Sequence, residues 1–217
     1  MLPSDDESLG FFTPISKFIG QFYIPLTNRN EVSIIGQFEQ ITLPSSLRFI
    51  KKGAFNSCPS LNEISIPSSL VSINSFAFHK CFSLEHVSIP SSIVSVGNSA
   101  FSLCKALKEF SFPSSLTTIG DWCFSECINL EKVTIPPSVT MIGENAFHGC
   151  KELEQIIISD SVVMIKSGAF KSCVSLKELI IPSGVKSIGS QAFYECTSLK
   201  EIKLPPDITV IAEKTFK

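Results

Sequence analysis

The chain has 217 residues, of which 44% are hydrophobic and 18% are charged, and its formal net charge is −2. This composition can form a buried core, so it excludes a disordered charged tail, and the weak net charge gives no strong attraction to nucleic acid or anionic lipid. With three His, one Trp and two Tyr against eighteen Phe, side chains common in catalytic sites are scarce.

Residues 1–40 carry only a faint version of the pattern that fills the rest of the chain. The first seven residues are acidic and contain a proline, unlike the basic start and apolar run of a secretory signal. No stretch reaches the ~18 consecutive apolar residues that a membrane helix requires. We expect residues 1–40 to form a divergent N-terminal coil or cap.

From residue 41 to the end, one 23-residue unit repeats without an insertion. A proline opens most units, and Ser159 takes its place in the sixth. The opening prolines are Pro44, Pro67, Pro90, Pro113, Pro136, Pro182 and Pro205. A fixed period of this length is typical of a solenoid. Residues 41–217 are therefore predicted to form one domain of seven complete coils and a truncated eighth.

The spacing inside a unit predicts its elements in order. Apolar residues three and six positions after the proline predict a short extended segment. Glycine often follows, at Gly97, Gly120, Gly143 and Gly189, and suggests a tight turn with positive φ. The motif Ala-Phe-x-x-Cys then predicts one helical turn, and Leu-x-x-Ile-x-Ile predicts a strand that the next proline ends. No single coil can bury its own apolar face, so stability must come from stacking.

Two positions of the unit are predicted to form the core. One is Phe in every unit: Phe55, Phe78, Phe101, Phe124, Phe147, Phe170, Phe193 and Phe216. The other is Cys in every complete unit: Cys58, Cys81, Cys104, Cys127, Cys150, Cys173 and Cys196. Stacked cysteines would have Cβ atoms about 4.8 Å apart, longer than the ~3.8 Å of a disulfide. We expect free thiols that act as small hydrophobic side chains, and no metal site.

The unit Ile-Pro-Ser-Ser-Leu-x-x-Ile-Gly-x-x-Ala-Phe-x-x-Cys-x-x-Leu-x-x-Val-x-Ile resembles the BspA-like class of leucine-rich repeats, known from oral and spirochaetal bacteria and expanded in Trichomonas and Entamoeba. The resemblance covers residues 41–217. It implies a right-handed leucine-rich-repeat horseshoe or slab, mainly β, with short parallel strands and one short helical turn per coil. It also implies surface-exposed adhesins and binding proteins without enzymatic activity.

Signals of catalysis are missing from the sequence. No phosphate-binding glycine motif occurs, and neither a histidine cluster nor a Cys/His dyad repeats along the chain. We therefore expect neither an enzyme nor a cofactor.

The outward positions of the predicted strands are the candidate binding surface. Most read as a solvated charged face with favourable pairs between neighbouring strands. Two adjacent outward isoleucines and two bulky aromatic residues before the Ala position depart from this pattern. The candidate partner-binding residues are Ile157, Ile180, Lys203, Lys177, Glu178, Lys200, Glu201, Trp122 and Phe76. The alternative for Phe76 and Trp122 is that they only cover gaps on the outer wall.

Two functions remain open at this stage. By resemblance, the chain is a cell-surface adhesin or surface antigen that binds host matrix or other cells. Alternatively, it is an intracellular scaffold, which the absence of a visible signal and the unpaired thiols favour. The cell surface is the expected location in the first case and the cytoplasm in the second. The last coil stops at Phe216 and Lys217, which suggests either truncation of a longer array or end-to-end self-association through the uncapped C-terminal coil.

Overall fold

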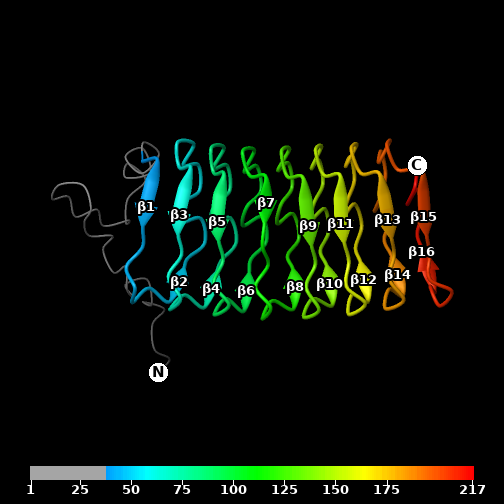
Figure 1. The fold of residues 1–217 in the computed structure, drawn as a ribbon, viewed down its shortest axis with the longest axis horizontal. Helices are drawn as coiled ribbons and strands as arrows, with labels where there is room; N and C mark the ends of the chain where they lie inside the picture. The colour runs from blue at the N-terminus through cyan, green and yellow to red at the C-terminus, as the bar shows by residue number, and fades with distance from the viewer. Residues whose placement is uncertain (1–37) are drawn as a thin grey trace, which may run out of the picture.

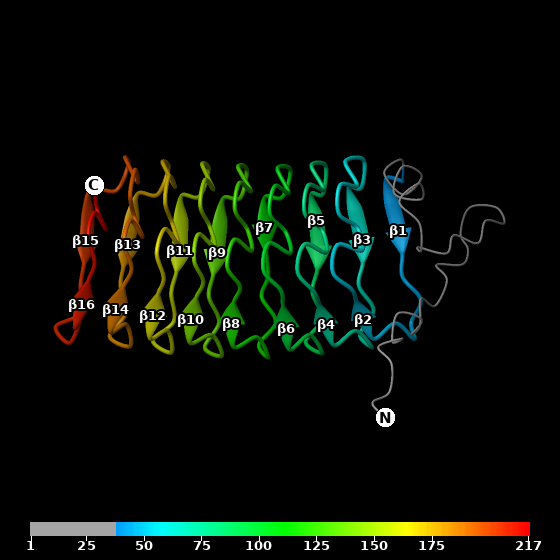
Figure 2. The same cartoon turned by 180° about the vertical axis from the view of Figure 1, so that it is seen from behind.

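A computed structural model describes residues 38–217 as a β-solenoid whose coils stack along one straight axis (Figure 1). Each coil contributes one strand to each of two walls, and the two rows of strands are visible from both sides (Figures 1 and 2). The predicted repeat solenoid of about seven coils with short parallel strands is thereby confirmed. Of the predicted N-terminal cap, residues 1–37 lie outside the described part of the chain.

The odd-strand wall consists of the eight odd-numbered strands, which form from the Leu-x-x-Ile-x-Ile end of the units. They are β1 (Gln40–Thr42), β3 (Glu63–Ser65), β5 (His86–Ser88), β7 (Glu109–Phe110), β9 (Lys132–Thr134), β11 (Gln155–Ile157), β13 (Glu178–Ile180) and β15 (Glu201–Lys203). In most of them the first and third residues are exposed and the middle one is buried. This alternation is the period-2 pattern of a half-buried strand.

The even-strand wall consists of the eight even-numbered strands, each only two residues long. They are β2 (Phe49–Ile50), β4 (Ser72–Ile73), β6 (Ser95–Val96), β8 (Thr118–Ile119), β10 (Met141–Ile142), β12 (Met164–Ile165), β14 (Ser187–Ile188) and β16 (Val210–Ile211). Neighbouring strands pair in parallel with a shift of one unit, as Met141 pairs with Met164. The second extended segment of each unit is therefore confirmed.

Between the two walls, the core is built from stacked side chains of equivalent positions. Consecutive Phe rings from Phe55 to Phe216 stack with centroids 5.2–5.6 Å apart and interplanar angles of 2–10°. The cysteines of the repeated position are buried beside them. Because every coil presents the same residue at the same place, each ring covers the face of the next.

The Ala-Phe-x-x-Cys segment together with the residue before it, here called the corner, does not form the predicted helical turn. Within residues 38–217 no helix forms, and the corner consists of successive turns with i→i+3 hydrogen bonds, such as Ser125 N to Trp122 O at 3.2 Å. Two residues of each corner have positive φ, for example Trp122 (59°) and Glu126 (60°). Left-handed residues interrupt a helix. Here alternate N–H groups donate to the next coil instead, as Phe124 N does to Ala146 O at 2.8 Å.

The glycines that follow the even-numbered strands serve a purpose other than the predicted one. Positive φ was expected at Gly97, Gly120, Gly143 and Gly189, but none of the four has it. A Cβ atom on Gly143 would instead lie 2.6 Å from the carbonyl carbon of Gly120. Close approach between coils is therefore the reason for glycine at Gly97, Gly143 and Gly189.

Both walls are interrupted at the same place, which we call the seam: the boundary between β5 and β7 on one wall and between β6 and β8 on the other. Phe110 and Phe112 occupy positions that hold smaller aliphatic residues in the other units. Their rings pack edge-on against each other at 4.9 Å and against Phe124 at 4.5 and 5.5 Å. We expect this extra volume to hold apart the strands on either side of the seam.

Candidate functional site

The odd-strand wall presents three columns of outward side chains, which run along the solenoid axis. Column A, the residue before each strand, is Asn62, Glu85, Lys108, Glu131, Glu154, Lys177 and Lys200. Column B, the first strand position, is Glu63, His86, Glu109, Lys132, Gln155, Glu178 and Glu201. Column C, two positions further, is Ser65, Ser88, Ser111, Thr134, Ile157, Ile180 and Lys203. All except half-buried Asn62 are exposed.

An apolar patch interrupts column C near its C-terminal end. The side chains of Ile157 and Ile180 are 53% and 68% exposed, on the neighbouring strands β11 and β13. The ladder between these strands is reduced to the single pair Gln155 and Glu178. A shallow hollow of about 470 Å³ adjoins the patch, lined by Lys177, Glu178, Leu179, Ile180, Ser198, Lys200, Glu201 and Lys203. The structure thus brings seven of the nine sequence-predicted binding residues to one surface.

Charge pairing on this wall is weaker than the sequence suggested. The one ion pair between columns A to C of the described residues joins Lys177 Nζ to Glu154 Oε1 at 2.9 Å, and it holds the pKa of that carboxyl below its usual value. The other register partners are mixed: Glu109 and Lys132 on β7 and β9 have opposite charges. Glu178 and Glu201 on β13 and β15 have the same charge. Like charges directly opposite each other destabilise a sheet.

The two predicted aromatic residues lie apart from this surface. Phe76 and Trp122 occupy the corners that follow β4 and β8, at the first positive-φ position, and are 37% and 42% exposed. Each packs edge-on against a histidine, Phe76 on His79 at 5.7 Å and Trp122 on His148 at 6.0 Å. They do not join the isoleucine patch, and their contacts agree with the alternative that they cover the outer wall.

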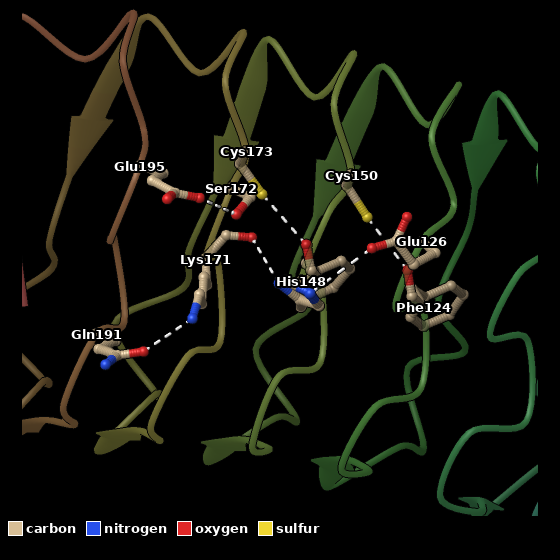
Figure 3. A network of polar contacts seen from close by, with 10 residues as sticks. Phe124, Glu126, His148, Cys150, Lys171, Ser172, Cys173, Gln191 and Glu195 are labelled. Carbon is tan, nitrogen blue, oxygen red and sulfur yellow. Dashed lines mark hydrogen bonds and ion pairs between the residues drawn. The ribbon is translucent and has the colours of Figure 1, made fainter.

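Polar side chains on the corners connect one coil to the next (Figure 3). His148 Nε2 lies 3.6 Å from Glu126 Oε1, and its Nδ1 lies 3.1 Å from the carbonyl oxygen of Lys171. Lys171 Nζ donates in turn to Gln191 Oε1 at 3.0 Å. In the same network Ser172 Oγ donates to Glu195 Oε2 at 2.7 Å, so each of these contacts joins one coil to the next.

The cysteines have a role that the spacing did not reveal. All eight are free and buried, and Cys150 Sγ donates to the carbonyl oxygen of Phe124 in the preceding coil at 3.2 Å. The same bond recurs at 3.1–3.2 Å along the whole described column from Cys81 onwards. Burial raises the pKa of the Cys123 and Cys196 thiols to about 12. A pKa raised this far keeps these two thiols protonated at neutral pH, and Cys196 uses its proton to donate to the carbonyl oxygen of Phe170.

A second repeated bond was also missed. The second serine after the proline donates its hydroxyl to a carbonyl of the preceding coil, as Ser69 does to Leu47 at 2.6 Å and Ser92 to Leu70 at 2.6 Å. The recurrence of the second serine was the available signal of this coil-to-coil bond.

Neither a metal centre nor a membrane helix is found in the part of the chain that the structure describes. Within residues 38–217, no three His, Cys, Asp or Glu side chains gather as metal ligands would. The same range contains no helix with the length and apolar character to cross a membrane.

Known proteins share both the repeat and the fold of this chain. The chain matches the family described as BspA type leucine rich repeat region, in six copies over residues 33–154 and 117–217. A leucine-rich repeat protein of T. pallidum is 32% identical, with a TM-score of 0.71, over 75% of this chain and 78% of that one. A leucine-rich repeat protein of Bacteroides ovatus is 29% identical, with a TM-score of 0.68, over 79% and 50%.

Another similar structure is the pneumococcal vaccine antigen PcpA, which is 27% identical with a TM-score of 0.55, over 78% of this chain and 51% of that one. The chain therefore spans about half the length of the Bacteroides and pneumococcal proteins. No curated protein matches the chain.

Proposed function

The chain belongs to the BspA-type leucine-rich repeat family, and from that premise we propose that it is a non-catalytic protein that binds a protein partner through its odd-strand wall. The observation that carries this proposal is the exposed pair Ile157 and Ile180, where the other described coils place serine, threonine or lysine. An apolar patch rimmed by charged side chains is the usual composition of a protein contact site.

The more specific form of the proposal is an adhesin on the cell surface, which binds host matrix or other cells. Two observations support an adhesin: the chain belongs to the BspA-type family, and one similar solved structure is named a cell surface protein. A solved relative from Faecalibacterium prausnitzii, 26% identical with a TM-score of 0.55 over 85% of this chain and 59% of that one, is named a leucine rich cell surface protein. Antibody staining of intact source cells, compared with permeabilised cells, tests the location. Staining only after permeabilisation contradicts it.

The binding surface is tested with a matched pair of variants. Ile157→Ser together with Ile180→Ser removes the patch, and we expect binding to immobilised extracellular matrix extract to fall at least about tenfold, because buried apolar anchors carry much of the energy of an interface. Val163→Ser together with Met164→Ser is the control, since these side chains are 48% and 42% exposed on or beside the even-strand wall. An equal loss of binding in both variants, or no loss of binding in the Ile157 and Ile180 variant, contradicts the proposed surface.

The second candidate is an intracellular scaffold that uses the same wall. The eight free cysteines favour it, because unpaired thiols are typical of a reducing compartment. Their burial weakens that argument, because a buried thiol is shielded from oxidants in an oxidising compartment as well. Under this candidate, the partner of the isoleucine patch is recovered from cytosol and not from matrix extract.

A further inference from the structure

Columns A and B of the odd-strand wall carry a charge pattern that repeats within every coil. Four units place opposite charges side by side in the two columns. These pairs are Lys108 and Glu109, Glu131 and Lys132, Lys177 and Glu178, and Lys200 and Glu201. A fifth pairs Glu85 with His86, and the remaining two combine a carboxylate with an amide. In no complete unit do the two columns carry charges of the same sign.

Along the columns, within one chain, the pattern is mixed. Opposite charges are neighbours at Glu85 and Lys108, Lys108 and Glu131, Glu154 and Lys177, and Glu109 and Lys132. Column A places Glu131 beside Glu154 and Lys177 beside Lys200, and column B pairs Glu178 with Glu201 in register. Three like-charged neighbours therefore face each other inside the sheet, where such contacts are destabilising. Apart from Lys177, bonded to Glu154, these charged residues form no ion pair within residues 38–217. The stability of the single solenoid therefore explains only part of the charge order, whereas the opposite or mixed character within every coil has no exception.

We propose that the odd-strand wall binds a second copy of this chain face to face, about a two-fold axis that runs parallel to the solenoid between columns A and B. Such an axis maps each coil onto the same coil of the second copy and column A onto column B. Lys177 then faces Glu178 of the second copy and Lys200 faces its Glu201. Every charged pair across the interface is opposite in sign, or charged against polar, and none is like-charged.

The shape of the array permits this match. The coils follow one straight axis in both views (Figures 1 and 2), so a coil opposed to its own copy at one end stays opposed along the wall. An interface of this kind is isologous, because the same surface is used on both sides. Seven coils at about 4.8 Å spacing make it roughly 30 Å long but only two columns wide. It lies among small, transient interfaces and depends on salt.

This inference rests on the proposed function in one respect, that the odd-strand wall is a protein-binding surface. It uses columns A and B and does not need Ile157 or Ile180. Self-association is measured on the purified chain without an external partner. A failure to dimerise therefore leaves matrix binding in place, and a failure to bind matrix leaves the dimer in place.

Sedimentation velocity of the purified full chain at about 100 µM tests the proposal by comparing low ionic strength with about 0.5 M salt, where the screening length falls to a few Å. We expect dimers in the first condition and monomers in the second. Lys177→Glu with Lys200→Glu makes both columns acidic at these coils, and Glu178→Lys with Glu201→Lys makes both basic. Each variant alone should self-associate at least about tenfold more weakly, while all four changes together should restore the dimer.

The decisive measurement is the mixture of the two double variants. In a mixed pair, acidic columns of one copy face basic columns of the other at both positions, so association should recover. General attraction is controlled with Glu144→Lys and Glu213→Lys, which give the same formal charge of +2 (−2 plus 4) as the basic variant but lie outside the odd-strand wall. This control should not bind the acidic variant. A monomeric wild-type chain, or equal binding by the control, overturns the proposal.

Discussion

Two boundaries between coils differ although the repeat is the same on both sides. At the boundary between β8 and β10, Thr140 N donates to Thr117 O and Gly143 N to Ile119 O, each at 2.9 Å. At the seam, the equivalent amides of Thr117 and Gly120 make no such bond to the preceding coil within the described residues. A Cβ on Gly120 would lie 3.2 Å from the neighbouring glycine carbonyl carbon, against 2.6 Å for Gly143. The coils are further apart at the seam.

The corners cross both boundaries without a change. Phe101 N donates to Cys123 O across the seam at 2.9 Å, and Phe124 N to Ala146 O at the next boundary at 2.8 Å. Cys127 and Cys150 make the same 3.2 Å thiol bond to the preceding coil. The corners and the Phe stack therefore connect the coils on both sides of the seam. The strand ladders of the two walls, in contrast, are interrupted next to the larger side chains Phe110 and Phe112.

If the Phe stack connects the coils, the loss of one of its rings should lower the free energy of unfolding more than any other substitution in the chain predicted below. Phe147 is fully buried and stacks on Phe124 at 5.4 Å and on Phe170 at 5.3 Å. Phe147→Ala should lower the free energy of unfolding by about 3–5 kcal/mol, because it leaves a cavity and removes both stacking contacts. Denaturant unfolding measures the loss. Trp122→Ala, at a 42% exposed side chain, is the control, and an equal loss there contradicts the assigned core.

The spacing of the coils is tested at two equivalent glycines. Gly143→Ala places a methyl group against backbone atoms 2.6–2.7 Å away, so we expect a loss of about 1–3 kcal/mol. At Gly120 the nearest atom, 2.9 Å away, is the side-chain oxygen of Asn98, which can move. Gly120→Ala should therefore change the free energy of unfolding by less than about 1 kcal/mol, since the reduced entropy of the unfolded chain offsets a small strain. Equal losses at both positions would show that the seam is not wider.

Much of this architecture could be predicted from the sequence because the repeat fixes which positions face inward. The buried Phe and Cys positions and the two extended segments per unit follow from spacing alone. The left-handed corner positions did not, since the residues there range from Gly53 to Trp122 and carry no common signal. The role of glycine was misjudged for a related reason. A requirement for close approach and a requirement for positive φ select the same residue, and only the distance between coils separates them.

The seam and the thiol bonds could not be predicted from the sequence, whereas the isoleucine patch could. Phe110 and Phe112 are larger than the residues at the same positions of the other units, but their effect on the ladders depends on volumes summed over neighbouring coils. The isoleucine patch was predicted from column C, because outward positions of a strand can be read from alternation. The thiol bonds could not be predicted from the sequence. Each joins the cysteine of one coil to the phenylalanine carbonyl of the preceding coil, and the spacing within one unit does not give the position of one coil relative to the next.

The smallest expected effect is local, and it tests the cause of the seam. Native-state hydrogen exchange should be at least about tenfold faster for the amides of Lys108 and Thr117 than for those of Glu131 and Thr140, because the latter two are bonded to the preceding coil at 2.9 Å.

The variant Phe110→Val with Phe112→Ile restores side chains of the size found in the other units, and the native ladder should then close across the boundary. If aromatic volume holds the walls apart, exchange at Lys108 and Thr117 slows to the rate of their counterparts, while the amide of Phe101, bonded through the corner, does not change. Continued fast exchange in this variant would assign the opening to the backbone path between β6 and β7 and not to the two rings.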